Sequence, residues 1–288
     1  MNSFRTAVAP APDPIQTALT LRAKGRLQEA LDTLVATREF SADFYILRGD
    51  LQRELGQIRD AAESYATVTD QDPDRLYAQS QLGACRYRLQ QWESAVQAFQ
   101  AVLRFDPHRD EIRLALADCL LRLQRFGLAM ECFDQCWSDA SRPRALFGKA
   151  VALQLLRRYD EAEKHYERLL AIDPSAEEAL ANLIAMSMEV FELARVQEYS
   201  QRLLGINNRS TIALQGLALA AIERRDYPVA ASYFFQLSDM NPEIMRPPAQ
   251  PSPAVEYRIS QKVFETLEDA RRKQKSKSAH ASGGDLPR

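Results

Sequence analysis

The sequence predicts an all-α fold built from repeated helix pairs, and three observations support this prediction. A small residue recurs about every 34 residues and is followed four positions later by an aromatic residue. Proline closes four of these units, eight residues beyond the aromatic one. The 288 residues include only ten glycines and no alternating Val/Ile/Thr runs, so no sheet is expected. The small–aromatic pairs are Ala61–Tyr65, Ala95–Phe99, Ala129–Phe133, Ala162–Tyr166 and Ala230–Phe234.

Each unit is predicted to contain two helices joined by a tight turn. Gly83 on the first helix and Ala95 on the second let the two helices approach closely, while Trp92 and Phe99 fill the space beside them. Proline ends the second helix because it has no backbone N–H and disfavours helical geometry in the residue before it. A solenoid of such units adds core with every repeat and needs no single large centre. The Asp-Pro pairs that end units are Asp72-Pro73, Asp106-Pro107 and Asp173-Pro174.

This pattern resembles the tetratricopeptide repeat (TPR), a family of helix hairpins. The resemblance implies a right-handed superhelical solenoid of about seven hairpins, in which residues 11–41 look like a shortened first repeat. Residues 177–210 keep the helical rhythm but lack the expected small residue, alanine, aromatic and proline. The units that fit well are 42–75, 76–109, 110–142, 143–176 and 211–244; the departures are Ile184, Val196, Ser200 and Asn208.

The two ends of the chain differ from the repeats. An amphipathic helix is predicted near the C-terminus, and it either caps the last repeat or lies in a groove or on a partner. The residues after it are basic but lack interleaved aromatic residues, so we expect a solvated tail and no binding of nucleic acid. The expected segments are a flexible N-terminus (1–10), the solenoid (11–244), a Pro-rich linker (245–253), the C-terminal helix (254–275) and a disordered tail (276–288).

The sequence gives little support for catalysis or metal binding. None of the three histidines lies in a His-Glu-x-x-His motif, and no glycine-rich phosphate loop is present. Cys132 and Cys136 are one helical turn apart, a spacing that suits a metal or a redox pair, but no histidine lies near them in sequence. Cys85 and Cys119 occupy the same position of neighbouring repeats, where a small packing residue is needed. We therefore favour buried structural thiols, and expect no enzyme, cofactor or metal.

The sequence also bears on where the chain works. Residues 1–16 contain no apolar stretch behind a basic start, so we expect no secretory signal. No window approaches about eighteen consecutive apolar residues, so no membrane insertion is expected. Cysteines that serve as packing residues fit a reducing compartment, and we predict a cytoplasmic location.

The TPR resemblance also predicts a binding site. In that family the concave face formed by the first helices holds an extended peptide or a partner helix, and here the centre of that face is apolar. The Lys and Asn residues with which some TPR adaptors clamp the C-terminus of heat-shock chaperones are missing, since only Asn182 occupies such a position. The predicted groove residues are Tyr77, Tyr87, Arg88, Leu114, Asp118, Leu121, Phe147, Val151, Leu155, Met188, Leu219 and Ile222.

A local resemblance is more specific. Leu82–Arg86 with Trp92, and Ala117–Leu121 with Ala129, are similar to the class II chaperones of bacterial type III secretion, which hold translocator proteins before export. That resemblance covers about sixty residues, and those chaperones have about three repeats. The sequence thus predicts a non-enzymatic module that binds a protein or peptide, as chaperone or adaptor, with a link to type III secretion. The alternative is a permanent scaffold subunit of an assembly.

Overall fold

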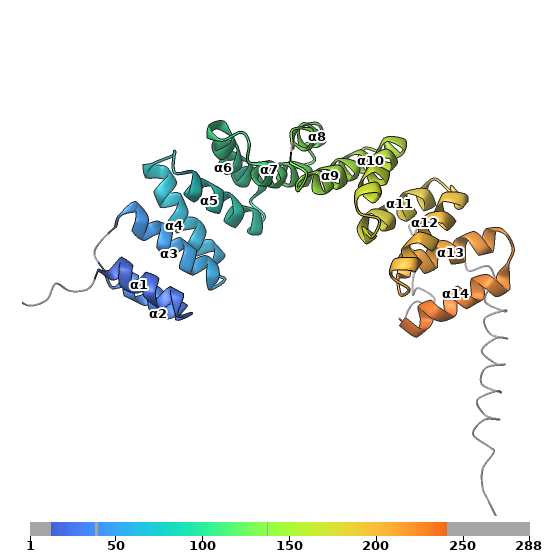
Figure 1. Ribbon diagram of the computed structural model, residues 1–288, viewed down its shortest axis with the longest axis horizontal. Helices are drawn as coiled ribbons and strands as arrows, with labels where there is room; N and C mark the ends of the chain where they lie inside the picture. The colour runs from blue at the N-terminus through green and yellow to red at the C-terminus, as the bar shows by residue number, and fades with distance from the viewer. Residues whose placement is uncertain (1–12, 38–39, 137, 241–288) are drawn as a thin grey trace, which may run out of the picture. The chain divides into compact units, whose positions relative to one another are not determined.

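The computed structural model describes residues 13–37, 40–136 and 138–240, and within these ranges it contains helices and no strand (Figure 1). The chain divides into two compact units, residues 1–156 and 157–288, and each is described by itself. The first unit contains α1 (Pro14–Ala23), α2 (Leu27–Val35), α3 (Ala42–Glu54), α4 (Ile58–Gln71), α5 (Leu76–Arg88), α6 (Trp92–Phe105), α7 (Asp110–Arg122), α8 (Phe126–Asp134) and α9 (Arg142–Leu155). The second contains α10 (Tyr159–Ile172), α11 (Glu177–Glu189), α12 (Leu193–Ile206), α13 (Thr211–Glu223) and α14 (Tyr227–Met240). The all-α prediction is confirmed.

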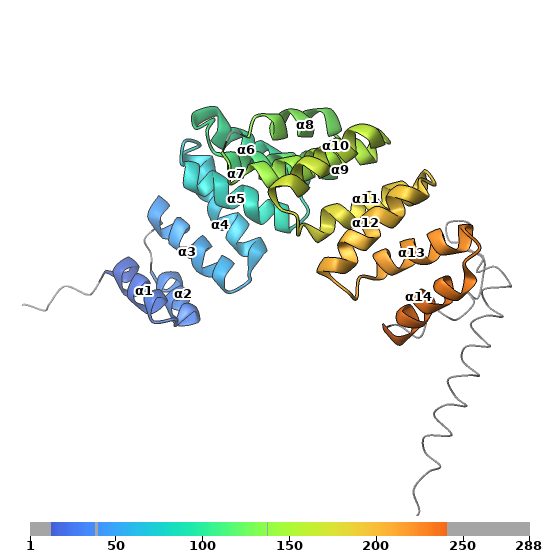
Figure 2. The same cartoon turned by 45° about the vertical axis from the view of Figure 1, so that its right-hand side comes forward.

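Helices that follow one another in the chain pack side by side within each unit. In the first unit α3 packs on α4, α5 on α6 and α7 on α8, and each of these hairpins also contacts the next one (Figures 1 and 2). In the second unit α11 packs on α12 and α13 on α14, while α12 also packs on α13. This is the helix–turn–helix order that the sequence period predicts.

The ends of the second helices lie where the Asp-Pro pairs predict them. The helices α4, α6 and α10 end at Gln71, Phe105 and Ile172, each directly before the aspartate of its pair. The Asp106 carboxylate then accepts hydrogen bonds from the backbone N–H of His108 at 3.3 Å and from Arg109 Nε at 2.8 Å. The aspartate therefore satisfies backbone donors of the turn while proline ends the helix.

Residues 110–142 depart from the regular pattern. Their second helix, α8, has 9 residues, whereas α6 has 14. The segment has no Asp-Pro pair to fix the end of its second helix. The chain leaves α8 at Asp134 and reaches α9 through an irregular connection that is held by polar contacts, described below.

The recurring aromatic residues fill the space between helices of the first unit. Tyr65, Phe99 and Phe133 are buried, and the rings of the first two lie directly over Gly49 and Gly83 of their own first helices. A Cβ atom on Gly83 would lie 2.5 Å from the Phe99 ring, and one on Gly49 would lie 2.8 Å from the Tyr65 ring. The small residues in the repeat are therefore required by close helix contact.

Residues 177–210 form a hairpin although they lack the residue types of the repeat. Ile184, Val196 and Ser200 are buried, and a Cβ atom on Gly216 of α13 would lie 2.5 Å from Ser200 Oγ. Serine therefore replaces the usual aromatic ring at a point where the next helix comes closer. The hairpin keeps the close packing with different residues.

The remaining predicted segments lie outside the described residues. These are the N-terminus (1–10), the linker (245–253), the C-terminal helix (254–275) and the tail (276–288), and they stay predictions.

The contacts around the glycines predict that two Gly-to-Ala substitutions change the stability of the chain in opposite directions. We expect Gly83→Ala to destabilise the chain by about 1–3 kcal/mol, because the new methyl group overlaps the buried Phe99 ring. In Gly205→Ala, on α12, nothing lies within 4 Å of the new methyl group, so a gain of about 0.5–1 kcal/mol is expected from helix propensity. Urea unfolding followed by circular dichroism measures both. Equal changes in the two variants would contradict the contact.

Candidate binding surface on the first helices

The first helices of the N-terminal repeats are tied together by the buried carboxylate of Asp50. Its Oδ1 accepts hydrogen bonds from the hydroxyl groups of Tyr65 at 2.6 Å and Tyr77 at 2.8 Å. Its Oδ2 pairs with Arg22 at 3.3 Å, and Arg22 also pairs with Glu54. One carboxylate on α3 therefore joins α1, α4 and α5.

One of the predicted groove residues, Tyr77, belongs to this network. The Tyr77 ring is 46% exposed, but its hydroxyl is used in the bond to Asp50. Partial burial, followed by the hydrogen bond to Asp50, raises the pKa of Tyr77 to about 12. Tyr77 can therefore offer a partner its ring, while its hydroxyl remains in the network.

A second carboxylate ties α7 to α9. Asp118 Oδ2 pairs with Arg144 at 3.3 Å, and α7 and α9 are in contact. Burial raises the pKa of the Asp118 carboxyl, and the nearby charges of Arg144 and Arg122 oppose that shift. Asp118 thus joins neighbouring first helices in the same way as Asp50.

Accessible apolar side chains follow one line on α9. Phe147, Val151 and Leu155 are spaced by four residues, which places them on one face of the helix. Phe147 and Val151 are half-buried, and Leu155 is 57% exposed. On α7 the half-buried Leu121 presents a further aliphatic group.

Two predicted groove residues belong to the core. Leu114 is 2% exposed and lies in the cluster that contains Ala95, Phe99 and Phe133, and Leu219 is 8% exposed. Neither can contact a partner, because packing against their own unit covers them. In the second unit, Met188 on α11 and Ile222 on α13 are half-buried. We call the accessible members in the first unit the first-helix surface: Tyr77, Tyr87, Arg88, Asp118, Leu121, Phe147, Val151 and Leu155.

Comparison with known proteins supports the repeat fold. Residues 46–110 match the model of the tetratricopeptide repeat, and residues 89–169 match that of subunit 3 of the anaphase-promoting complex, or cyclosome. The C-terminal part of a TPR-containing protein from Cytophaga hutchinsonii superposes with a TM-score of 0.68 at 14% identity, covering 88% of this chain and 99% of that one. The fold is that of a TPR protein.

Other solved structures share the TPR fold at low identity. A TPR protein from Parabacteroides merdae gives a TM-score of 0.58 at 16% identity, with 88% of this chain and 96% of that one covered. The pilF protein of Pseudomonas aeruginosa gives 0.56 at 17% identity, with 70% and 92% covered. The comparison with curated proteins gives no match.

Asn182, the one residue of the TPR chaperone clamp found in the sequence, is engaged within its own unit. Its Nδ2 donates a hydrogen bond to the Tyr166 hydroxyl at 2.9 Å, from α11 to α10. The amide therefore fixes two neighbouring TPR helices.

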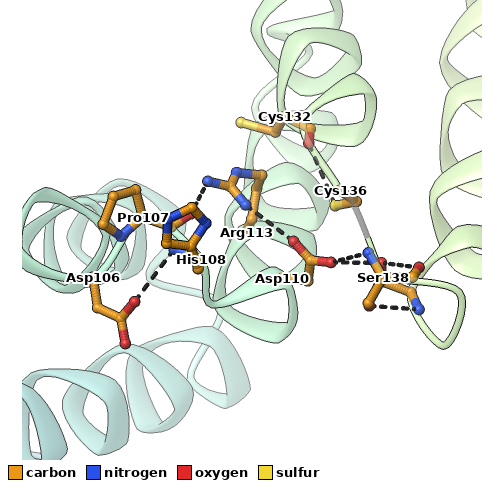
Figure 3. Close-up of polar contacts among 9 residues, drawn as sticks. Asp106, Pro107, His108, Asp110, Arg113, Cys132, Cys136 and Ser138 are labelled. Carbon is orange, nitrogen blue, oxygen red and sulfur yellow. Dashed lines mark hydrogen bonds and ion pairs between the residues drawn. The ribbon is translucent and has the colours of Figure 1, made fainter.

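A cluster of polar residues at the start of α7 holds the irregular connection between α8 and α9 (Figure 3). The Asp110 carboxylate accepts hydrogen bonds from the Ser138 backbone N–H and the Ser141 hydroxyl, both at 2.8 Å. It also pairs with Arg113 at 3.1 Å, and Arg113 donates to the carbonyl oxygen of Pro107. Both charged side chains are buried in α7, and their further hydrogen bonds join this helix to Pro107 on one side and to the connection before α9 on the other.

The cysteines have the environment of packed thiols. Cys85 and Cys119 are buried, and the partly buried Cys132 and Cys136 lie against the core of the first unit. Burial raises the pKa of Cys119 to about 12 and that of Cys136 to about 11, so both thiols are protonated near neutral pH. Among the described residues, no group of three or more His, Cys, Asp or Glu side chains could hold a metal ion. No described helix is long and apolar enough to cross a membrane.

Sequence reasoning missed Asp50, Trp92 and Arg122 as residues of the candidate site. Asp50 lies about two repeat lengths before Asp118, so register could have paired the two carboxylates. Trp92 and Arg122 meet in space, with the guanidinium carbon 6.0 Å from the ring centroid. Nothing in the sequence spacing indicates that contact.

The buried ion pair predicts that replacing Asp110 lowers the stability of the chain strongly, whereas replacing Asp139 changes it little. We expect Asp110→Ala to destabilise the chain by about 3 kcal/mol or more, because Arg113 would remain buried without its carboxylate partner. Asp139→Ala is the matched control: its side chain is 95% exposed and pairs with Arg142 at 3.2 Å, so a change within about 0.5 kcal/mol is expected. Urea unfolding compares the two, and similar losses would contradict this role for Asp110.

Proposed function

We propose that this chain is a non-enzymatic, cytoplasmic binding module that holds a peptide segment or helix in an apolar concave groove, as a chaperone or adaptor. The line of Phe147, Val151 and Leu155 on α9 carries the proposal, because it presents accessible apolar groups at the spacing of one helix face. The half-buried Leu121 lies on α7, a helix in contact with α9. Burial of such groups by a partner is worth about 25 cal/mol per Å² of apolar surface.

The polar contacts of the same helices support a preformed site. Asp50 and Asp118 join neighbouring first helices through Tyr77 and Arg144, so their relative positions are set before a partner binds. A preformed surface loses less conformational entropy on binding than a flexible one. Because residues 82–129 resemble class II chaperones of type III secretion, we propose translocator proteins as one class of client.

A permanent scaffold subunit is the alternative. Affinity purification of the tagged chain from its own cells separates the two proposals. A client that exchanges and is present below stoichiometry supports the chaperone or adaptor. A subunit that co-purifies at constant stoichiometry supports the scaffold.

Binding should depend on Phe147. We expect Phe147→Ser to weaken binding of the partner identified by that purification at least tenfold, about 1.4 kcal/mol, because apolar contact area is lost. Phe105→Ser is the matched control, since Phe105 is 55% exposed on the second helix α6 and should leave affinity within about twofold. Titration calorimetry measures affinity, and circular dichroism checks that both variants are helical. Unchanged affinity in a folded Phe147→Ser chain would move the site elsewhere.

A further inference from the structure

Four residues lie where α5 and α7 end and α6 begins, and we call them the aromatic–arginine cluster: Tyr87 and Arg88 in the last turn of α5, Trp92 at the start of α6 and Arg122 at the end of α7. The Tyr87 and Trp92 rings meet edge to face, with centroids 5.1 Å apart and an interplanar angle of 74°. The guanidinium carbon of Arg122 lies 6.0 Å from the Trp92 centroid. Both arginines are exposed, and both rings are half-buried. Trp92 thus contacts the last turn of one first helix, through Tyr87, and that of the next, through Arg122.

Neither Arg88 nor Arg122 forms an ion pair with a described residue, although the charge of Arg122 acts on the nearby Asp118 carboxylate. Arg75 and Arg109, by contrast, each pair with an aspartate one turn earlier: Arg75 with Asp72 at 3.0 Å and Arg109 with Asp106 at 2.8 Å. No Asp or Glu occurs in residues 76–92 or 119–130. Asp118 precedes Arg122 by one turn, but its carboxylate is bonded to Arg144.

We infer that the cluster receives an acidic segment of a partner protein, with carboxylates on Arg88 and Arg122 and an apolar side chain against the Tyr87–Trp92 pair. This inference rests on the proposed function and gives its client a chemical class. A guanidinium binds a carboxylate through two parallel hydrogen bonds, and arginine and aromatic residues dominate the binding energy of many interfaces.

A nucleic acid is the other polyanion that arginines and aromatic rings can bind. The whole chain has a formal net charge of −2, so at longer range it does not attract a nucleic acid. A short acidic segment needs only the local charge of the two arginines. The acidic peptide therefore fits better, and an oligonucleotide becomes a probe in the test.

The experiment selects phage-displayed random peptides of about 16 residues on the full-length chain. We expect the enriched peptides to carry an excess of Asp and Glu together with aromatic or aliphatic residues. One enriched peptide is then synthesised and titrated against the wild type, the double variant Arg88→Gln/Arg122→Gln, and Arg104→Gln. Arg104 is exposed on α6 and makes no ion pair with any described residue, so it is the matched control.

We expect the dissociation constant to rise at least tenfold in the double variant and less than twofold in Arg104→Gln. Added salt should weaken binding to the wild type more than binding to the double variant. Enriched peptides without an acidic excess, whose binding needs Phe147 but not the arginines, would overturn this inference and leave the proposed function standing. No enrichment would count against both. Binding of a labelled oligothymidine that is lost in the double variant would overturn the acidic-peptide inference in favour of a nucleic acid.

Discussion

The close contact between an aromatic ring and a glycine on the facing helix is the constraint on which the repeats depend. At Gly83 and Gly49 the ring of the second helix lies where a side chain of the first helix would otherwise be. Neither helix can bury its apolar face alone, so this contact brings each hairpin together and determines how far apart its helices lie. The same packing therefore determines how the side chains on the surface of the first helices are spaced.

Polar contacts add specificity to this apolar framework. Asp50 and Asp118 occupy equivalent positions two repeats apart, and each bonds to the next first helix in the chain, at Tyr77 and Arg144. Asp110 does the same for an irregular connection that has no Asp-Pro pair. A buried carboxylate whose donors come from separate elements disfavours other arrangements of those elements, because any slip would leave it unpaired.

The helices and their ends could be predicted because their causes are local. Apolar periodicity and the Asp-Pro pairs act within a few residues, and α4, α6 and α10 end where those pairs predict. The turn conformations were harder, since Gln90, Gln124 and Phe191 have positive φ angles without being glycine. There the flanking helices impose the left-handed conformation against local preference. The repeat register assigned residues to the first helices but could not show which of them the core covers. Leu114 and Leu219 were therefore included in the predicted groove, although packing covers both.

The positions of Arg88 and Arg122 explain how two arginines that form no ion pair with a described residue are accommodated without loss of stability. Both lie in the last turn of their helices, α5 and α7, where the partial negative charge of the helix C-terminus favours a cation. That interaction acts through the backbone and leaves the guanidinium donors in solvent, whereas an ion pair within the chain would use them. Folding thus places Arg122 against the half-buried aromatic pair, with Arg88 next to Tyr87 in the chain, while the exposed guanidinium groups remain available to an anion from outside the chain.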